Sequence, residues 1–257
     1  MRDEFRLPLA LLYGFLLVLT RVGSAVAFVP LPGFRNAPEL ARVVLALSLT
    51  FALFPVWPAL GDTVPAAGTF LLWLAAEAAL GAGVGLTIAF LTEGFVLGAQ
   101  ILGLQAGYSY ASTIDPASQA DTSVLQVLAQ LAGNLLFFAL GMDREVIRAF
   151  AWSLESLPPG SFVLRIASAE GILKLGAGLF ATGFRLAIPV VALLMMFDIA
   201  LALMGRINAQ LQLLSLAFPV KMLAALLTLA AIAPLLPLLY RQWSEQTLGA
   251  MWALVGR

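Results

Sequence analysis

The chain has 257 residues, of which 61% are hydrophobic and only 11% are charged, and its formal net charge is zero. Soluble domains carry about 25% charged residues, so the composition excludes an ordinary soluble domain. The chain contains no Cys and no His, which excludes thiol catalysis, disulfides, metal sites built on these ligands and every Ser-His triad. No dense basic cluster indicates nucleic-acid binding.

Apolar stretches separated by Pro and Gly predict the first elements along the chain. One stretch runs from Leu7 to about Val29, and a second runs from Val43 to Phe54. Residues 66–107 contain no proline, and as one helix they would reach about 60 Å, about twice the hydrocarbon thickness of a bilayer. We therefore expect this helix to protrude, or to break near Glu93-Gly94 and double back.

The second half of the chain continues the pattern with apolar stretches at 124–140, 173–204 and 213–239. Residues 144–157 and 241–257 instead carry apolar side chains on one helical face only, which predicts amphipathic helices at an interface. The sequence thus predicts an all-α integral membrane protein with about six long apolar helices, forming a single polytopic domain over residues 1–257.

The distribution of cations predicts the topology. No Lys or Arg lies between Arg42 and Arg144, and with six spans most cations collect on the side of the N-terminus. The positive-inside rule then places both termini in the cytoplasm and residues 107–124 on the far side. We expect no cleaved signal peptide, because Asp3 and Glu4 offset the arginines that precede the first apolar stretch.

Five ionisable residues lie within apolar stretches, where a charge is costly and often functional. They are Arg21, Glu77, Arg185, Asp198 and Lys221. These charges allow two interpretations. They can form structural ion pairs, within the chain or with partner subunits. Alternatively, Glu77, Arg185 and Asp198 can form the relay of a proton- or ion-coupled small-molecule transporter. No catalytic constellation, cofactor motif or metal-ligand cluster is found, so we expect no enzyme, no cofactor and no metal.

Glycines four residues apart predict close helix packing, because small residues let helix backbones approach each other. Three such pairs follow one another along the proline-free stretch. These are Gly81 with Gly85, Gly94 with Gly98, and Gly103 with Gly107.

A small, polar and weakly acidic segment, GYSYASTIDPASQADTSV, interrupts the apolar sequence at residues 107–124. Turn-forming residues such as Asp115-Pro116 are typical of an ordinary loop. Irregular backbone at membrane depth is tolerated only where it is buried in protein or lines a watery cavity, so a segment that lines or blocks a pore is equally compatible with this composition.

Several short motifs, in this order, resemble the FliR family of flagellar biosynthesis proteins, called SctT in virulence-type III secretion systems. The matching stretches are Arg21-Val22-Gly23, Pro38 to Arg42 with Val43, Glu77 with Gly81 and Gly85, Gly98-Ala99-Gln100, Gln105-Ala106-Gly107, Ile114-Asp115-Pro116, Leu157-Pro158-Pro159-Gly160, Ala187-Ile188-Pro189-Val190 and Phe218-Pro219-Val220-Lys221. The resemblance covers essentially the whole chain. Residues 206–212 depart from the Pro-Gln-x-Asn run that is usual in the family.

The resemblance implies a core subunit of an export gate in the bacterial inner membrane, associated with the flagellar basal body or a secretion apparatus. Its helices would form helical hairpins and assemble with FliP-like and FliQ-like subunits, alongside FlhB- and FlhA-like export components. Unfolded secreted proteins would pass through the resulting channel. A loop of this subunit, at residues 107–122, would plug the pore. The plug residues implied are Gly107, Tyr108, Ser109, Tyr110, Ala111, Ser112, Thr113, Ile114, Asp115 and Pro116.

Overall fold

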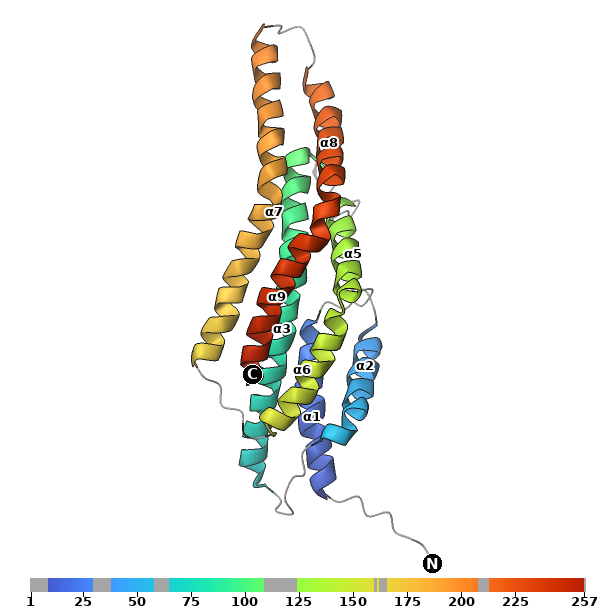
Figure 1. The fold of residues 1–257 in the computed structure, drawn as a ribbon, viewed down its shortest axis with the longest axis vertical. Coiled ribbons are helices and arrows are strands. Elements are labelled where there is room, and N and C mark those ends of the chain that lie inside the picture. Colours follow the sequence, from blue (N-terminus) through green and yellow to red (C-terminus); the bar gives the residue numbers. More distant parts are fainter. Residues whose placement is uncertain are drawn as a thin grey trace, which may run out of the picture. The chain divides into compact units, whose positions relative to one another are not determined.

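A computed structural model describes residues 9–29, 38–57, 65–108, 124–159, 161, 166–207 and 213–256. In these ranges the chain forms helices and no strand, which confirms the predicted all-α class (Figure 1). The elements are α1 (Leu9–Phe28), α2 (Glu39–Ala52), the 3-10 turn η1 (Phe54–Val56), α3 (Ala67–Ala106), α5 (Val124–Ala139), α6 (Met142–Ser156), α7 (Ile166–Ile207), α8 (Leu213–Ile232), the 3-10 turn η3 (Ala233–Leu235) and α9 (Leu236–Leu254).

The described helices identify a multi-pass membrane protein, but they do not reach the expected count of six spans. Four are long and apolar enough to cross a bilayer, and α5 and α6 together, bent by 61°, would make a fifth. The four are Leu9–Phe28, Ala67–Ala106, Glu170–Arg206 and Pro219–Leu254. Helix α2 has only 14 residues, whereas a spanning helix needs about 20.

Of the two alternatives for residues 66–107, one continuous helix or a break near Glu93-Gly94, the structure has the first, because α3 continues through both residues as one helix of 40 residues. A single glycine costs a helix only about 1 kcal/mol, so the apolar stretch continues through it. The helix expected near 241–257 corresponds to α9 (Leu236–Leu254), which starts five residues earlier than expected. Helix α9 already begins at Leu236, after the 3-10 turn that contains Pro234.

The amphipathic helix expected near 144–157 is confirmed as α6. It buries Ala149, Phe150 and Leu154 on one face, while Arg144 and Arg148 are exposed. Gly141 precedes it with φ of +70°, a conformation that glycine adopts without the steric cost of a side chain. This glycine therefore marks the bend between α5 and α6.

The chain divides into two compact units. The first comprises residues 1–90, 138–175 and 244–257, and the second comprises residues 91–137 and 176–243. In the first unit α1 packs beside α2, with Leu17, Val18 and Val22 fully buried. In the second unit residues from α3, α5, α7 and α8 form a buried apolar cluster that includes Leu102 and Val190.

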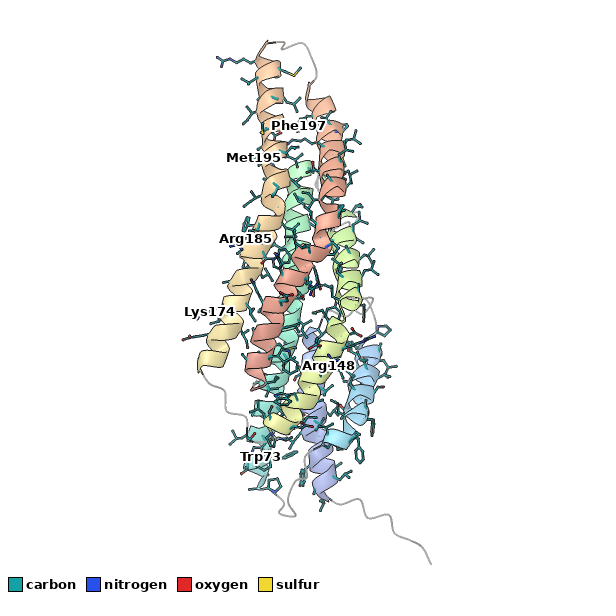
Figure 2. All side chains as sticks on the ribbon, in the orientation of Figure 1. Trp73, Arg148, Lys174, Arg185, Met195 and Phe197 are labelled. Atoms are coloured by element: carbon teal, nitrogen blue, oxygen red, sulfur yellow. The ribbon has the colours of Figure 1, made fainter. Side chains whose placement is uncertain are left out.

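Large apolar side chains also cover the outer faces of the helices, as expected for a protein surrounded by lipid or by other apolar helices. Met195 and Met196 on α7 are 53% and 71% exposed. Figure 2 labels Arg185, Met195 and Phe197 along this helix.

Candidate functional site

A buried cluster of polar groups surrounds Arg21 in the first unit. The Arg21 side chain is fully buried, and its Nε donates a hydrogen bond to Glu77 Oε2 at 2.5 Å. Its Nη1 donates to the carbonyl oxygen of Ser153 at 2.7 Å and to the Ser153 hydroxyl at 3.1 Å. Its Nη2 donates to the carbonyl oxygen of Leu157 at 2.8 Å. One guanidinium therefore joins α1, α3 and the end of α6.

The position of these acceptors explains why an arginine suits this site. Ser153 lies in the last turn of α6, and Leu157 is its C-cap residue. The last carbonyl groups of a helix lack partners within the helix and carry partial negative charge. Arginine presents several donors in a rigid planar fork, so it neutralises Glu77 and caps α6 at the same time.

Two of the predicted packing glycines bring α1 and α3 into direct backbone contact beside this cluster. A Cβ atom at Gly81 would lie 2.0 Å from the carbonyl oxygen of Arg21, and one at Gly85 would lie 2.5 Å from the carbonyl oxygen of Ala25. Neither site has room for a methyl group. The helices can approach closely enough for the Arg21–Glu77 pair because these positions lack side chains.

The next glycine pair packs α3 against α7 in the second unit. A Cβ atom at Gly98 would lie 3.2 Å from the carbonyl oxygen of Gly183, and one at Gly94 would lie 3.4 Å from the Thr182 methyl group. Gly103 is buried. The contact at Gly94 and Gly98 is less tight than the one at Gly81, so α1 and α3 make the closer approach.

A second polar cluster joins three helices of the second unit. Lys221 on α8 forms an ion pair with Asp198 on α7, and Gln105 on α3 donates to the other carboxylate oxygen of Asp198 at 3.3 Å. The Lys221 side chain is 14% exposed, whereas that of Asp198 is 44% exposed. This pair is therefore less enclosed than Arg21 and Glu77.

Four of the five charges within apolar stretches form two ion pairs, one in each compact unit. Glu77 pairs with Arg21, and Asp198 pairs with Lys221. Arg185 lies exposed on α7. The structure thus gives Glu77 and Asp198 separate cationic partners, which favours structural ion pairs over the coupled transporter site of Glu77, Arg185 and Asp198.

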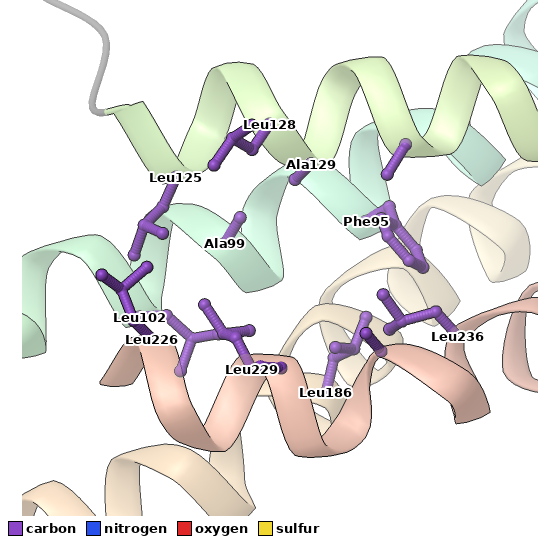
Figure 3. A pocket seen from close by; sticks show the side chains of 13 residues that line it. Phe95, Ala99, Leu102, Leu125, Leu128, Ala129, Leu186, Leu226, Leu229 and Leu236 are labelled. Carbon is purple, nitrogen blue, oxygen red and sulfur yellow. The ribbon is translucent and has the colours of Figure 1, made fainter. Parts of the chain in front are cut away.

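A cavity of about 330 Å³ in the second unit has only Phe, Ala and Leu in its lining, among them Phe95, Ala99, Leu128, Leu226 and Leu236 (Figure 3). Such a lining offers no group to bind an ion or transfer a proton.

The polar segment starts from a defined helix end. Gly107, with φ of +88°, follows α3; its N–H bonds to the carbonyl of Leu104, and the Tyr108 N–H bonds to that of Gly103. This is a Schellman C-cap, in which glycine is preferred. The remaining plug residues, Ser109, Tyr110, Ala111, Ser112, Thr113, Ile114, Asp115 and Pro116, lie outside the described residues.

The Tyr108 side chain ties this helix end to α8. Its hydroxyl donates to the carbonyl oxygen of Met222 at 3.1 Å, and its ring packs against the buried cluster of the second unit. Burial raises the pKa of the Tyr108 hydroxyl, so the group stays a protonated donor at neutral pH. The predicted segment is thus anchored at its first aromatic residue.

Sequence reasoning missed the contribution of α6 to the Arg21 cluster. The acceptors are mainly backbone carbonyls of Ser153 and Leu157, and a backbone acceptor leaves no mark in the sequence. It also missed the contact between α6 and the chain end, where the Ser156 hydroxyl donates to the carbonyl oxygen of Val255 at 2.7 Å.

Comparison with known proteins places this geometry in context. Residues 12–247 match the model of a family described as "Bacterial export proteins, family 1". The chain is 31% identical over 219 residues to the flagellar biosynthetic protein FliR of Escherichia coli (strain K12), a match that covers 85% of this chain and 83% of the relative. It is 24% identical to the proteins of the same name from Aquifex aeolicus (strain VF5) and Bacillus subtilis (strain 168), over 91% and 94% of this chain and 88% and 95% of the relatives.

Proposed function

Because the chain belongs to the bacterial export proteins of family 1, we propose that it is a core membrane subunit of the flagellar protein export gate in the bacterial inner membrane. The observation that carries this proposal is the match to flagellar export proteins over nearly the whole chain. With FliP-like and FliQ-like subunits it forms the channel through which unfolded substrate proteins pass. FlhB- and FlhA-like components assist it from the same apparatus.

The ion pairs support a role as a scaffold in this assembly. Arg21 and Glu77 are fully buried and neutralise each other, so they stabilise the packing of α1, α3 and α6 without needing a transported ion. The outer face of α7 is rich in exposed apolar side chains, including Phe184, Ile188 and Ile199. This face suits contact with the apolar helices of neighbouring subunits.

Residues 107–122 act as the pore plug in this proposal. A small polar segment can fill a wet channel and withdraw from it at little desolvation cost, since its polar groups are hydrated in either position. The Schellman cap at Gly107 and the hydrogen bond of Tyr108 to α8 support a firm anchor at the start of the segment. Tyr108, Tyr110 and Ile114 supply the packing that closes the channel.

Membrane permeability in the assembled complex tests the plug. Deleting residues 109–118 should make cells that carry the complete gate leaky to ions and small solutes. A matched replacement of these ten residues by a Gly/Ser linker preserves chain length but removes Tyr110 and Ile114, and it should also leak. Unchanged permeability in both variants would contradict the plug.

Purification with partners tests the wider proposal separately. The chain should co-purify with two smaller hydrophobic membrane proteins, and both plug variants should retain them, because α1, α3 and α6 are untouched. A chain that is complete and active as an isolated monomer would overturn the assignment to the gate. Loss of partners from a plug variant would instead show that its leak reflects faulty assembly.

A further inference from the structure

A groove with a marked change of polarity runs between α1 and α2 in the first unit. Its volume is about 390 Å³. Ala27, Glu39 and Arg42 line it near the ends of the two helices that are adjacent along the chain, whereas Leu19 and Leu47 line it farther along α1 and α2. Ala27 lies eight residues after Leu19, which corresponds to about 12 Å along the helix. The groove is therefore charged at one end and apolar along the rest of its length.

Gly23 leaves room along this groove. It lines the cavity, and a Cβ atom built there meets no heavy atom within 4 Å. This differs from Gly81, where a Cβ atom would overlap the backbone of α1. Gly23 thus serves no close helix contact within the described residues, and its missing side chain widens the groove instead.

The charged end of the groove carries one negative and one positive side chain within about one turn of α2. Glu39 and Arg42 are three residues apart on α2, so their side chains lie on the same face. Arg42 makes other interactions, but its guanidinium has five N–H donors and can also bind a phosphate. Glu39 is exposed and offers a carboxylate to an ammonium group.

We propose that this groove binds phosphatidylethanolamine. The phosphate of the lipid lies on Arg42, its ammonium group donates to Glu39, and part of an acyl chain lies between Leu19 and Leu47, along Gly23. A lipid chain matches these walls because it is as apolar as leucine. A peptide would bring backbone polar groups that the apolar walls leave unsatisfied. Phosphatidylglycerol carries no cation for Glu39, and phosphatidylcholine has no N–H donor.

The site lies within the first unit and does not depend on the proposed export role. It is tested with the full-length chain, reconstituted into vesicles of equal parts phosphatidylethanolamine, phosphatidylcholine and phosphatidylglycerol. After extraction into mild detergent, native mass spectrometry counts the lipids that each protein retains. The wild-type chain should retain phosphatidylethanolamine in preference to the other two lipids.

Three substitutions separate the contributions of the site. Glu39→Gln should remove the preference for phosphatidylethanolamine over phosphatidylglycerol, by about tenfold, the effect of one charge-assisted hydrogen bond. Arg42→Gln should lower retention of all three lipids, and Arg42→Lys should restore part of it. Gly23→Leu should fill the groove and displace the lipid. Gly68→Leu, at an exposed glycine that also has open space around it, should change nothing.

Two results would overturn the proposal. Equal retention of phosphatidylethanolamine and phosphatidylglycerol by the wild-type chain would refute the charge pairing. Undiminished lipid retention by a folded Gly23→Leu variant would refute the groove as the binding site. If that variant keeps its lipid but loses a co-purifying membrane protein, the groove holds a helix of a partner instead.

Discussion

The backbone of Gly81 lies so close to the carbonyl oxygen of Arg21 that a Cβ atom at this glycine would be only 2.0 Å from the oxygen. One turn earlier on α3, Glu77 neutralises the guanidinium of the same arginine. The contact between α1 and α3 therefore joins a close backbone approach to a buried ion pair. Without its partner, either charge would remain buried and unpaired at this contact.

Gly81→Ala should destabilise the first unit by about 1–3 kcal/mol, the usual cost of overpacking, because backbone atoms of α1 must move away. Chemical unfolding of the purified chain in mild detergent measures the loss. Gly178→Ala is the matched control on α7, since a Cβ atom there meets nothing within 4 Å. It should be neutral or slightly stabilising, because alanine favours a helix more than glycine does. Equal losses in the two variants would contradict the close approach.

Arg21→Met should cost about 3–5 kcal/mol of unfolding free energy, because it leaves Glu77 buried without its cation. The double variant Arg21→Met with Glu77→Met should be more stable than Arg21→Met alone, since no buried charge remains. It should stay below the wild type, because the carbonyls of Ser153 and Leu157 still lose their donor. Together with the single variant Glu77→Met, the same unfolding assay gives the coupling energy of the pair. Strictly additive losses would show that the pair does not act as a unit.

Lys221→Met should destabilise the chain by about 1 kcal/mol or less, clearly less than Arg21→Met. The reason is the partial exposure of Asp198, at 44%, which reduces the cost of leaving its carboxylate unpaired. Arg148→Gln extends the series to the exposed pair with Glu145, where no measurable change is expected. Across the three variants, the loss of unfolding free energy should increase with the burial of the ion pair that is broken. If Lys221→Met lost as much unfolding free energy as Arg21→Met, Asp198 would have to be buried rather than 44% exposed.

Ser156→Ala should loosen the C-terminal end of the chain, because the Ser156 hydroxyl donates to the carbonyl oxygen of Val255. A loss of about 1 kcal/mol is typical of one hydrogen bond, and it should appear as faster hydrogen exchange at residues 252–256. Ser161→Ala is the control, since its hydroxyl donates locally, to the carbonyl of Pro158. Identical exchange in the two variants would show that Ser156 does not hold the chain end.

Much of the secondary structure was predictable because it depends on local periodicity. The apolar face of α6 follows from residues three and four apart, and the stop after it follows from Pro158-Pro159. For residues 66–107 the sequence left two alternatives open, one continuous helix or a break near Glu93-Gly94, because glycine weakens a helix without necessarily ending it; the structure has the continuous helix. The count of about six spans is not confirmed, since within the described residues four helices, or five with the bent pair α5 and α6, are long and apolar enough to cross a bilayer.

The partners within the ion pairs were not predictable. Five charges were recognised, but nothing in the sequence states that Arg21 meets Glu77, 56 residues away, or that Lys221 meets Asp198. The glycine spacing indicated that α3 packs closely, yet the same spacing at Gly81 and Gly94 serves contacts with two different helices. Spacing identifies the face of a helix but not the element that packs on it.

The amino-acid sequence by itself determined that this is an all-helical membrane protein with a polar segment at its centre, because hydropathy and helical period are properties of neighbouring residues. Only the tertiary structure decided that Arg21 neutralises Glu77 and caps α6, and that Gly23 opens a groove while Gly81 closes a contact. These outcomes depend on the register at which separate helices pack, which is a property of residues distant along the chain.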